Sequence, residues 1–336
     1  MTRNKLVIII SGIALYLFLL LVVSTRIPEL HNDSIRYKDI FDNMVNYGWS
    51  GRSEVGFRLY NYVVSLFTDS VEFIFMVLYL HIIVSYIFLI NYISNRLPTK
   101  DKYKIYFYFI FVLSSTWYYV SVVDGIRQGM SFPWLYLSCF LFLERKWLKS
   151  LLSFLFSLLF HTSGLLFLPF FILFKFKLNR ILTVLLVASF FYPLGINEQI
   201  IHFISSATRI PIYESIKFYN SGVDLFYGFN VRFYLYTLFF SISSFVIYIL
   251  FCIRNQVIED ALKMYMVFNV YFFVVGFAAF ANRYAFVAWN FIPILIIMLS
   301  IGLRVKINND IKVLILYLVS CISIFLFLSN FSVFNL

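Results

Sequence analysis

The chain has 336 residues, of which 62% are hydrophobic and 22% aromatic, and it carries a formal net charge of +11. This composition predicts a helical protein that crosses a lipid bilayer many times and has little chain left for a soluble domain. The positive charge does not indicate nucleic-acid binding, because the basic residues lie in short clusters between apolar spans, as they do in cytoplasmic loops.

The first third of the chain predicts two spans separated by an outer segment. Residues 6–23 form the first span, and the basic residues before it place the amino terminus in the cytoplasm. Residues 71–93 form the next span, and the basic residues in 94–104 mark a cytoplasmic loop. The segment 24–70 between the two spans carries both charge signs and is predicted to lie on the outer face.

The outer segment 24–70 has a helical periodicity of its own. Five of its residues recur at helical spacing and predict an amphipathic helix that lies on the membrane: Asp33, Arg36, Tyr37, Ile40 and Met44. Residues 57–68 predict a second helix, which would be short and tilted or re-entrant.

Shorter spans follow in the middle of the chain. Residues 105–123 cross outward and residues 130–143 return. The polar turn between them, which contains Asp124 and Arg127, is therefore predicted on the outer face. The basic residues in 144–150 mark the cytoplasm again.

The apolar stretch 151–174 has the length of one span. A single span would, however, place the basic residues from Lys175 onward outside. We therefore predict a break at His161, with two short helices, 151–160 and 164–174, that rise to the outer face and return.

The rest of the chain adds a second outer segment, 196–232, and a polar outer turn, 281–285. The spans predicted around them are 181–195, 233–253, 264–280, 286–303 and 313–329. The sequence thus predicts a single transmembrane domain over residues 1–336. It would be an all-α, polytopic integral membrane bundle of about 11 spans, some of them short or broken, with outer-face loops.

Two arginines on the predicted outer face fit an anionic ligand. Asp124 and Arg127 are three residues apart and would share one face of a helix. They form either a salt bridge that caps the helix or, since Gly125 and Gly129 remove side-chain bulk, a ligand site. Arg283 has no acidic neighbour in sequence, so its guanidinium group either binds phosphate oxygens or extends to the lipid headgroups.

Three further polar residues have two interpretations each. His161, in an apolar run, is either a neutral histidine bonded to a carbonyl at the helix break or a ligand or proton-transfer group. Asp33 either caps a helix or contributes to a site. Glu54 either complements a helix dipole or takes part in catalysis.

The sequence has no motif for cofactor chemistry. The three cysteines lie in separate apolar runs without metal or redox spacing, and there is no Walker loop or dinucleotide-binding glycine motif. We therefore expect neither a cofactor nor a metal site.

Taken in order, five short elements resemble the EpsG-type family of exopolysaccharide and O-antigen polymerases, the Wzy class. They are Asp33 to Tyr37, Glu54-Val55-Gly56-Phe57, Arg127-Gln128, His161-Thr162-Ser163 and Arg283-Tyr284. Each element is short, but the ordered series covers nearly the whole chain.

The resemblance implies a multi-pass glycosyltransferase of the cytoplasmic (inner) membrane. It would polymerise oligosaccharide repeats carried on undecaprenyl pyrophosphate at the outer face, without metal or nucleotide. Its partners would be that lipid-linked oligosaccharide, the lipid bilayer, a chain-length regulator and a flippase, but no nucleic acid. The catalytic candidates are Asp33, Glu54 and His161, and the substrate-binding candidates are Arg36, Tyr37, Asp124, Arg127, Gln128, Ser163, Arg232, Arg283 and Tyr284.

Two other functional classes are left open by the sequence. A flippase or transporter for the same lipid-linked oligosaccharide would typically have pseudo-symmetric halves, and no internal repeat is visible. An O-antigen ligase-like enzyme would transfer the glycan to a different acceptor. An acyltransferase would need a route for a cytoplasmic acyl donor, and no polar inner-face motif suggests one.

Overall fold

The computed structural model describes residues 3–25, 32–49, 51, 53–97, 111–113, 115–211, 213–214, 228–278 and 281–304. Every regular element in these ranges is a helix, and the only β-type pairing among them is an isolated bridge between Cys252 and Leu303. The all-α prediction is therefore confirmed. The chain divides into two compact units, and the boundary lies between Leu166 and Phe167.

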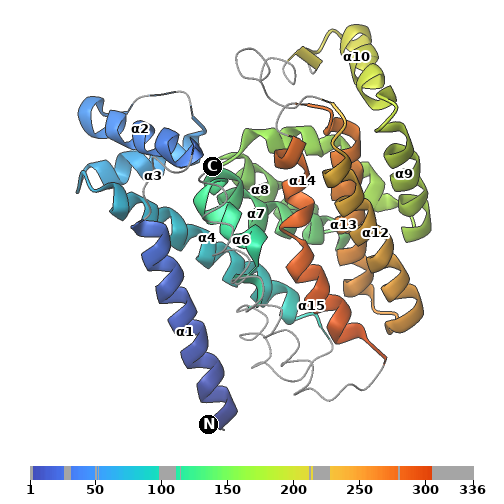
Figure 1. The fold of residues 1–336 in the computed structure, drawn as a ribbon, viewed down its shortest axis with the longest axis horizontal. Helices are drawn as coiled ribbons and strands as arrows, with labels where there is room; N and C mark the ends of the chain where they lie inside the picture. The colour runs from blue at the N-terminus through green and yellow to red at the C-terminus, as the bar shows by residue number, and fades with distance from the viewer. Residues whose placement is uncertain are drawn as a thin grey trace. The chain divides into compact units, whose positions relative to one another are not determined.

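The first unit is built around helix α7. Its helices are α1 Arg3–Ser24, α2 Asn32–Tyr47, α3 Val55–Ser65, α4 Val71–Ser94, α6 Thr116–Val123, α7 Ile126–Leu143 and α8 Trp147–Leu158 (Figure 1). Helix α7 packs against α4, α6 and α8, while α1 packs along α4. Helices α2 and α3 pack against each other and against α4.

Helix α2 confirms the helix predicted in the first outer segment, but its buried face differs from the predicted one. The residues that are almost fully buried are Ser34, Tyr37, Phe41 and Met44, whereas Arg36 is exposed. The hydroxyl of Ser34 donates to the carbonyl oxygen of Val123 at 3.0 Å. The apolar side of α2 therefore packs on protein, so the periodicity reflects a helix–helix interface. The placement of this helix on the membrane stays a prediction.

The break predicted at His161 is confirmed. Helix α8 ends at Leu158, and a 3₁₀ helix, Thr162–Lys175, follows. Gly164 and Pro169 both disfavour a continuous α-helix here, since glycine is flexible and proline has no amide hydrogen to donate. The break leaves His161 between two helices, where its side chain is not constrained to a helix face.

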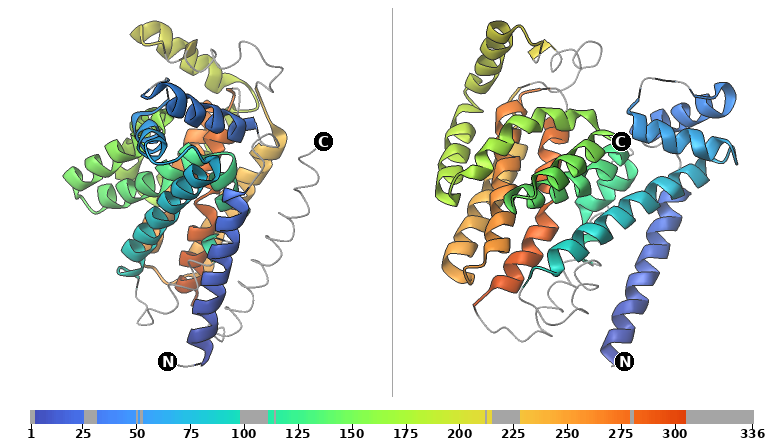
Figure 2. Two further views of the ribbon diagram at one scale, coloured as in Figure 1. Left: turned by 90° about the vertical axis from the view of Figure 1, so that its left-hand side faces the viewer. Right: turned by 180° about the vertical axis from the view of Figure 1, so that it is seen from behind.

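The second unit has helix α13 at its centre. Its helices are α9 Leu178–Phe191, α10 Ile196–Thr208, α12 Val231–Phe251, α13 Gln256–Val275, α14 Ala281–Trp289 and α15 Ile292–Gly302 (Figure 2). Helix α13 packs against α9, α10, α12, α14 and α15. Helices α9 and α10 are bent by 98° at a short break where Gly195 has a φ of +67°, a conformation that favours glycine.

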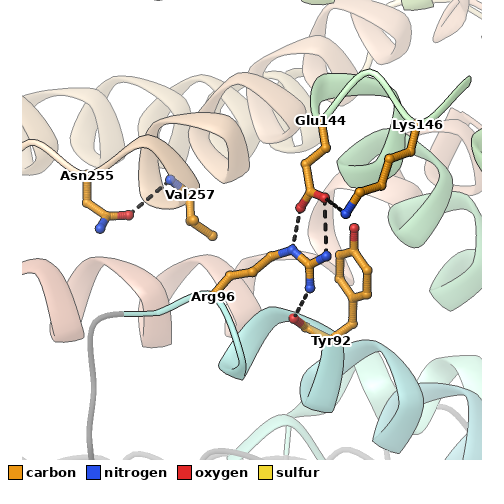
Figure 3. Close-up of polar contacts among 6 residues, drawn as sticks. All are labelled: Tyr92, Arg96, Glu144, Lys146, Asn255 and Val257. Carbon is orange, nitrogen blue, oxygen red and sulfur yellow. Dashed lines mark hydrogen bonds and ion pairs between the residues drawn. The ribbon is translucent and has the colours of Figure 1, made fainter.

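Within the first unit, two segments predicted to be cytoplasmic meet. At the end of α4, Arg96 forms a bidentate ion pair with Glu144 at the end of α7, and Lys146 approaches the same carboxylate at 2.5 Å (Figure 3). The guanidinium of Arg96 also lies over the ring of Tyr92, 3.4 Å from its centroid. Nearby positive charge holds the pKa of Glu144 below its usual value despite partial burial, which by itself raises it.

In the second unit, contacts also join segments that are predicted to lie on the same side. The carboxyl ends of α12 and α15, both predicted to be cytoplasmic, are joined by a 2.6 Å hydrogen bond from Ile253 N to the oxygen of Gly302. At the other end, Tyr192 donates to the oxygen of Gly276 at 3.0 Å. Figure 3 also shows Asn255, whose side chain accepts from an amide at the start of α13. These contacts join segments that are predicted to lie on the same side, but the sides themselves, including the outward placement of 24–70 and 196–232, stay predictions.

The prediction of about 11 spans is not confirmed. Three described helical segments are long and apolar enough to cross a membrane, Val71–Ser94, Val231–Phe251 and Ala281–Gly302, and a fourth is added if the bent pair α9 and α10 is one span. Other predicted spans, such as 130–143 and 264–280, correspond to helices that are not among these segments, α7 and α13. Others lie partly or wholly outside the described residues, among them 105–123 and 313–329.

Candidate functional site

Four of the predicted site residues come together in the first unit, and we name them the Glu54 cluster: Glu54, Arg127, Gln128 and His161. Arg127 donates from Nη1 to Oε2 of Glu54 at 2.6 Å. The other carboxylate oxygen, Oε1, lies 3.6 Å from Nδ1 of His161. On the far side of the imidazole, Nε2 lies 3.3 Å from the amide nitrogen of Gln128. One carboxylate therefore lies between a guanidinium group and an imidazole.

The contact with Gln128 indicates which ring nitrogen of His161 carries the proton. An amide nitrogen only donates hydrogen bonds, so the Nε2 that faces it must accept. The proton of the neutral ring then resides on Nδ1, which faces Glu54. This tautomer leaves the Nε2 lone pair as the proton-accepting position.

Each member of the cluster sits at the end of a helix. Glu54 is the residue before α3, yet its side chain makes no capping hydrogen bond to that helix. Arg127 and Gln128 lie in the first turn of α7, and His161 lies in the break after α8. The carboxylate of Glu54 is instead paired with Arg127, 73 residues further along the chain, and both interpretations of Glu54, dipole complementation and catalysis, stay open.

Gly56 allows the start of α3 to lie against the end of α8. Its amide donates to the carbonyl oxygen of Leu159 at 2.7 Å. A Cβ atom at this position would lie 2.8 Å from that oxygen and 2.9 Å from the ring of Phe160. Backbone atoms cannot yield as side chains can, so only glycine lets the start of α3 approach the end of α8 and bring Glu54 close to His161.

We expect Gly56→Ala to lower both thermal stability and activity, because the added methyl group would push α3 away from α8. Overpacking of this kind typically costs about 1–3 kcal/mol. Thermal unfolding of the purified protein in detergent measures the loss. Val55→Ala is the matched control, since Val55 is the exposed neighbour on the same helix. Equal melting temperatures for both variants would contradict the close approach.

Tyr37 connects the first sequence element to the cluster. Its hydroxyl donates to the carbonyl oxygen of Asp124 at 3.2 Å. Its ring packs on Phe57 with centroids 5.3 Å apart, and the guanidinium carbon of Arg127 lies 5.8 Å from the ring centroid. Tyr37 therefore lies beside Arg127 and helps to fix the turn from which α7 begins.

The helix face that Asp124 and Arg127 were predicted to share does not exist. Asp124 ends α6 and Gly125 precedes α7, so the spacing of three does not run along one helix. Arg127 forms an ion pair with Glu54. The free space predicted beside Gly129 is also absent, because a Cβ there would lie 2.3 Å from the oxygen of Ser121. Gly129 serves the close packing of α6 on α7.

The cluster is largely shielded from solvent. The side chains of Glu54, Arg127 and His161 are 9%, 14% and 17% exposed. Burial by itself raises the pKa of Glu54, but the contact with His161 and the positive charge of Arg127 outweigh it and lower the pKa to about 2. Glu54 is therefore ionised at neutral pH and is a weak proton acceptor in this arrangement.

The low pKa predicts a pH-dependent effect of Glu54→Gln on stability. A carboxyl group whose pKa is lower in the folded chain stabilises the fold above its usual value of 4.5 and loses that contribution as the pH falls toward about 2. We expect the variant to melt at a lower temperature than the native protein near pH 7, and the difference to narrow between about pH 4.5 and about pH 3. A difference that stays constant across that range would contradict the buried ion pair.

Three other predicted site residues of the first unit are placed by the structure. Asp33 is half-buried in the first turn of α2. Arg36 is exposed on α2, and Ser163 is half-buried at the start of the 3₁₀ helix. The roles of these three residues in the site stay predictions.

The remaining predicted site residues belong to the second unit. Arg232 is exposed at the start of α12. Arg283 and Tyr284 lie in the first turn of α14, where both are half-buried, and the ring of Tyr284 contacts that of Tyr271 at 6.0 Å. The convergence of Arg127 and Arg283 on one cavity stays a prediction, since the two residues belong to different units.

A half-buried polar pair that sequence reasoning missed lies close to the cluster. The hydroxyl of Tyr60 and Nδ1 of His81 are 2.8 Å apart, and both rings contact Phe160, the residue before His161. The position of His81 inside an apolar span was the one sequence feature that could have indicated it. The pair ties α3 and α4 to the helix break.

The described residues hold no group of three or more His, Cys, Asp and Glu side chains that could bind a metal ion. No curated protein and no solved structure matches the chain. The model of the EpsG family matches residues 9–336, which is nearly the whole sequence. The chain therefore belongs to the EpsG family, a Wzy-like family of polysaccharide polymerases.

Proposed function

We propose that this membrane protein polymerises undecaprenyl-pyrophosphate-linked oligosaccharide repeats into a surface polysaccharide at the outer face of the cytoplasmic membrane. The observation that carries the proposal is the Glu54 cluster in a chain of this family. Its residues come from three of the five sequence elements that resemble the family, and they meet although up to 107 positions separate them in sequence.

The proposed reaction joins two repeats by one substitution at an anomeric carbon. The hydroxyl oxygen of the acceptor sugar forms the new bond, and the bond from that carbon to the pyrophosphate oxygen breaks with its electron pair. Lipid pyrophosphate leaves, and the hydroxyl proton moves to a base. The energy resides in the donor, so no nucleotide is required.

The residues of the cluster fit distinct roles in this reaction. The planar guanidinium of Arg127 suits the oxygens of the departing pyrophosphate and stabilises the charge that develops on them. His161 is the proposed base, because its Nε2 is the accepting nitrogen. Glu54 is assigned a positioning role, since its low pKa disfavours proton uptake while its Oε1 faces the protonated Nδ1 of His161.

A purified preparation with defined lipid-linked repeats tests the proposal. A ladder of products that differ by one repeat is the expected result. A single transfer to another acceptor would instead identify a ligase-like enzyme, and redistribution of the lipid across a vesicle without new bonds would identify a flippase. A chain-length regulator, if it acts on this protein, should change the ladder lengths and not the bond formed.

A further inference from the structure

The Glu54 carboxylate is shared unequally between two partners. Oε2 makes a close ion pair with Arg127 at 2.6 Å, whereas Oε1 stays 3.6 Å from Nδ1 of His161, just beyond hydrogen-bond distance. A group that took Arg127 away would leave this mostly buried carboxylate beside Nδ1 of His161, the second partner that it has in the resting structure. A buried charge without a partner is costly, so the carboxylate should then close on the imidazole.

From this geometry, and resting on the proposed function, we infer that the donor pyrophosphate exchanges with Glu54 on Arg127, and that the released carboxylate moves onto Nδ1–H of His161. The pyrophosphate oxygens compete for the same guanidinium group, because both ligands are anionic and both suit its planar arrangement of donors. When no donor is bound, Glu54 therefore occupies the anion-binding position at the guanidinium group of Arg127. Binding of the donor pyrophosphate to Arg127 therefore also brings the Glu54 carboxylate to His161, the proposed base.

The exchange requires the donor to bind before His161 can activate the acceptor hydroxyl. Before the donor binds, Glu54 is 2.6 Å from Arg127 and 3.6 Å from Nδ1 of His161, so its closer ion pair is with Arg127. After the exchange, a full hydrogen bond from Nδ1–H to the carboxylate stabilises the imidazolium that forms when Nε2 takes the acceptor proton. The acceptor hydroxyl replaces the amide of Gln128 at Nε2. The site is then competent only when the activated sugar is present.

The decisive test is the affinity of the purified full-length protein for a short-chain polyprenyl pyrophosphate. Glu54→Gln removes the competing charge and keeps the shape, so it should bind the lipid about 10-fold more tightly, which corresponds to about 1.4 kcal/mol. In an Arg127→Ala background the same substitution should change affinity by less than about 2-fold, because no guanidinium remains to compete for. The uncharged polyprenol should show no change with either variant.

Controls separate exchange from a general structural effect. Glu72→Gln is the matched variant, since Glu72 is an exposed carboxylate of the same unit, at the start of α4, and should bind as the native protein does. If Glu54→Gln does not purify as folded protein, Glu54→Asp, whose shorter side chain weakens the pair, should still tighten binding by about 3-fold. Unchanged or weaker binding by a folded Glu54 variant would overturn the exchange.

Transfer should respond in the opposite direction to binding. Glu54→Gln, with its tighter lipid binding, should form new bonds at least about 10-fold more slowly at saturating substrate, because His161 has lost its carboxylate. The binding measurement needs no polymerisation. Tighter binding in a protein that makes no ladder would keep the exchange and refute the proposed function, whereas a ladder without tighter binding would do the reverse.

Discussion

Replacing Arg127 by alanine is expected to reduce polymer formation by about 100-fold in cells that still accumulate the protein in the membrane. The reason is that Arg127 is the cluster's cationic group at the point where the departing pyrophosphate gains charge. Arg127→Lys should recover activity only in part, because an ammonium group keeps the charge but loses the planar pair of donors. Polymer ladders and membrane abundance are measured together.

The control for Arg127 must separate lost chemistry from lost stability, because Arg127→Ala leaves Glu54 without its ion pair. Arg180→Ala is suitable, since Arg180 is an exposed arginine at the start of α9 and outside the proposed machinery. Arg283→Ala and Arg283→Lys test the predicted second phosphate ligand and should behave as the Arg127 variants do. Normal ladders from both alanine variants at normal abundance would exclude the anion site.

Replacing His161 by glutamine is expected to slow transfer by roughly 100-fold to 10,000-fold with little effect on lipid pyrophosphate affinity. Glutamine retains hydrogen bonding at the helix break but cannot accept a proton at neutral pH. The reason for the split is that only the imidazole can take the acceptor proton, whereas the amide of glutamine can still donate to the Glu54 carboxylate that Arg127 releases. Single-turnover rates and binding isotherms on purified protein measure the two effects separately.

The matched control for His161 is His202→Gln, because His202 is exposed on α10 in the second unit. It should retain native rates and affinity. A native transfer rate for folded His161→Gln would exclude this histidine as the base and would return the half-buried Asp33 to consideration for that role.

The helix break at His161 could be predicted from the sequence because two physical requirements conflicted there. The apolar stretch was long enough for one span, but one span would have put the basic residues from Lys175 onward on the wrong side of the membrane. A polar histidine at the middle of the stretch marked where the chain should turn. The structure has the break at that position, between α8 and the 3₁₀ helix.

The ion pair between Glu54 and Arg127 could not be predicted, because nothing local connects residues 73 positions apart. Spacing instead suggested Asp124, and that argument assumed a continuous helix where α6 in fact ends and α7 begins. Local periodicity is informative only within one element. The packing role of Gly129 was missed for a related reason, since its neighbour Ser121 lies on a different helix.

The buried face of α2 shows how one pattern can arise from two environments. Apolar residues at helical spacing indicate that one side of a helix is covered, but they do not say whether lipid or protein covers it. In the structure Tyr37 packs on Phe57 of α3, so protein covers it. The same ambiguity affects the span count, because an apolar helix such as α8 can be too short to cross a membrane alone.

The most direct test of the account is a single-turnover reaction of the purified protein with a labelled lipid-linked repeat, followed at both products. We expect one released lipid pyrophosphate for every new glycosidic bond in the native protein. We also expect both products to fall together by about 100-fold in Arg127→Ala at saturating substrate. Bond formation at the native rate in folded Arg127→Ala, or lipid pyrophosphate release without a new bond in the native protein, would contradict it.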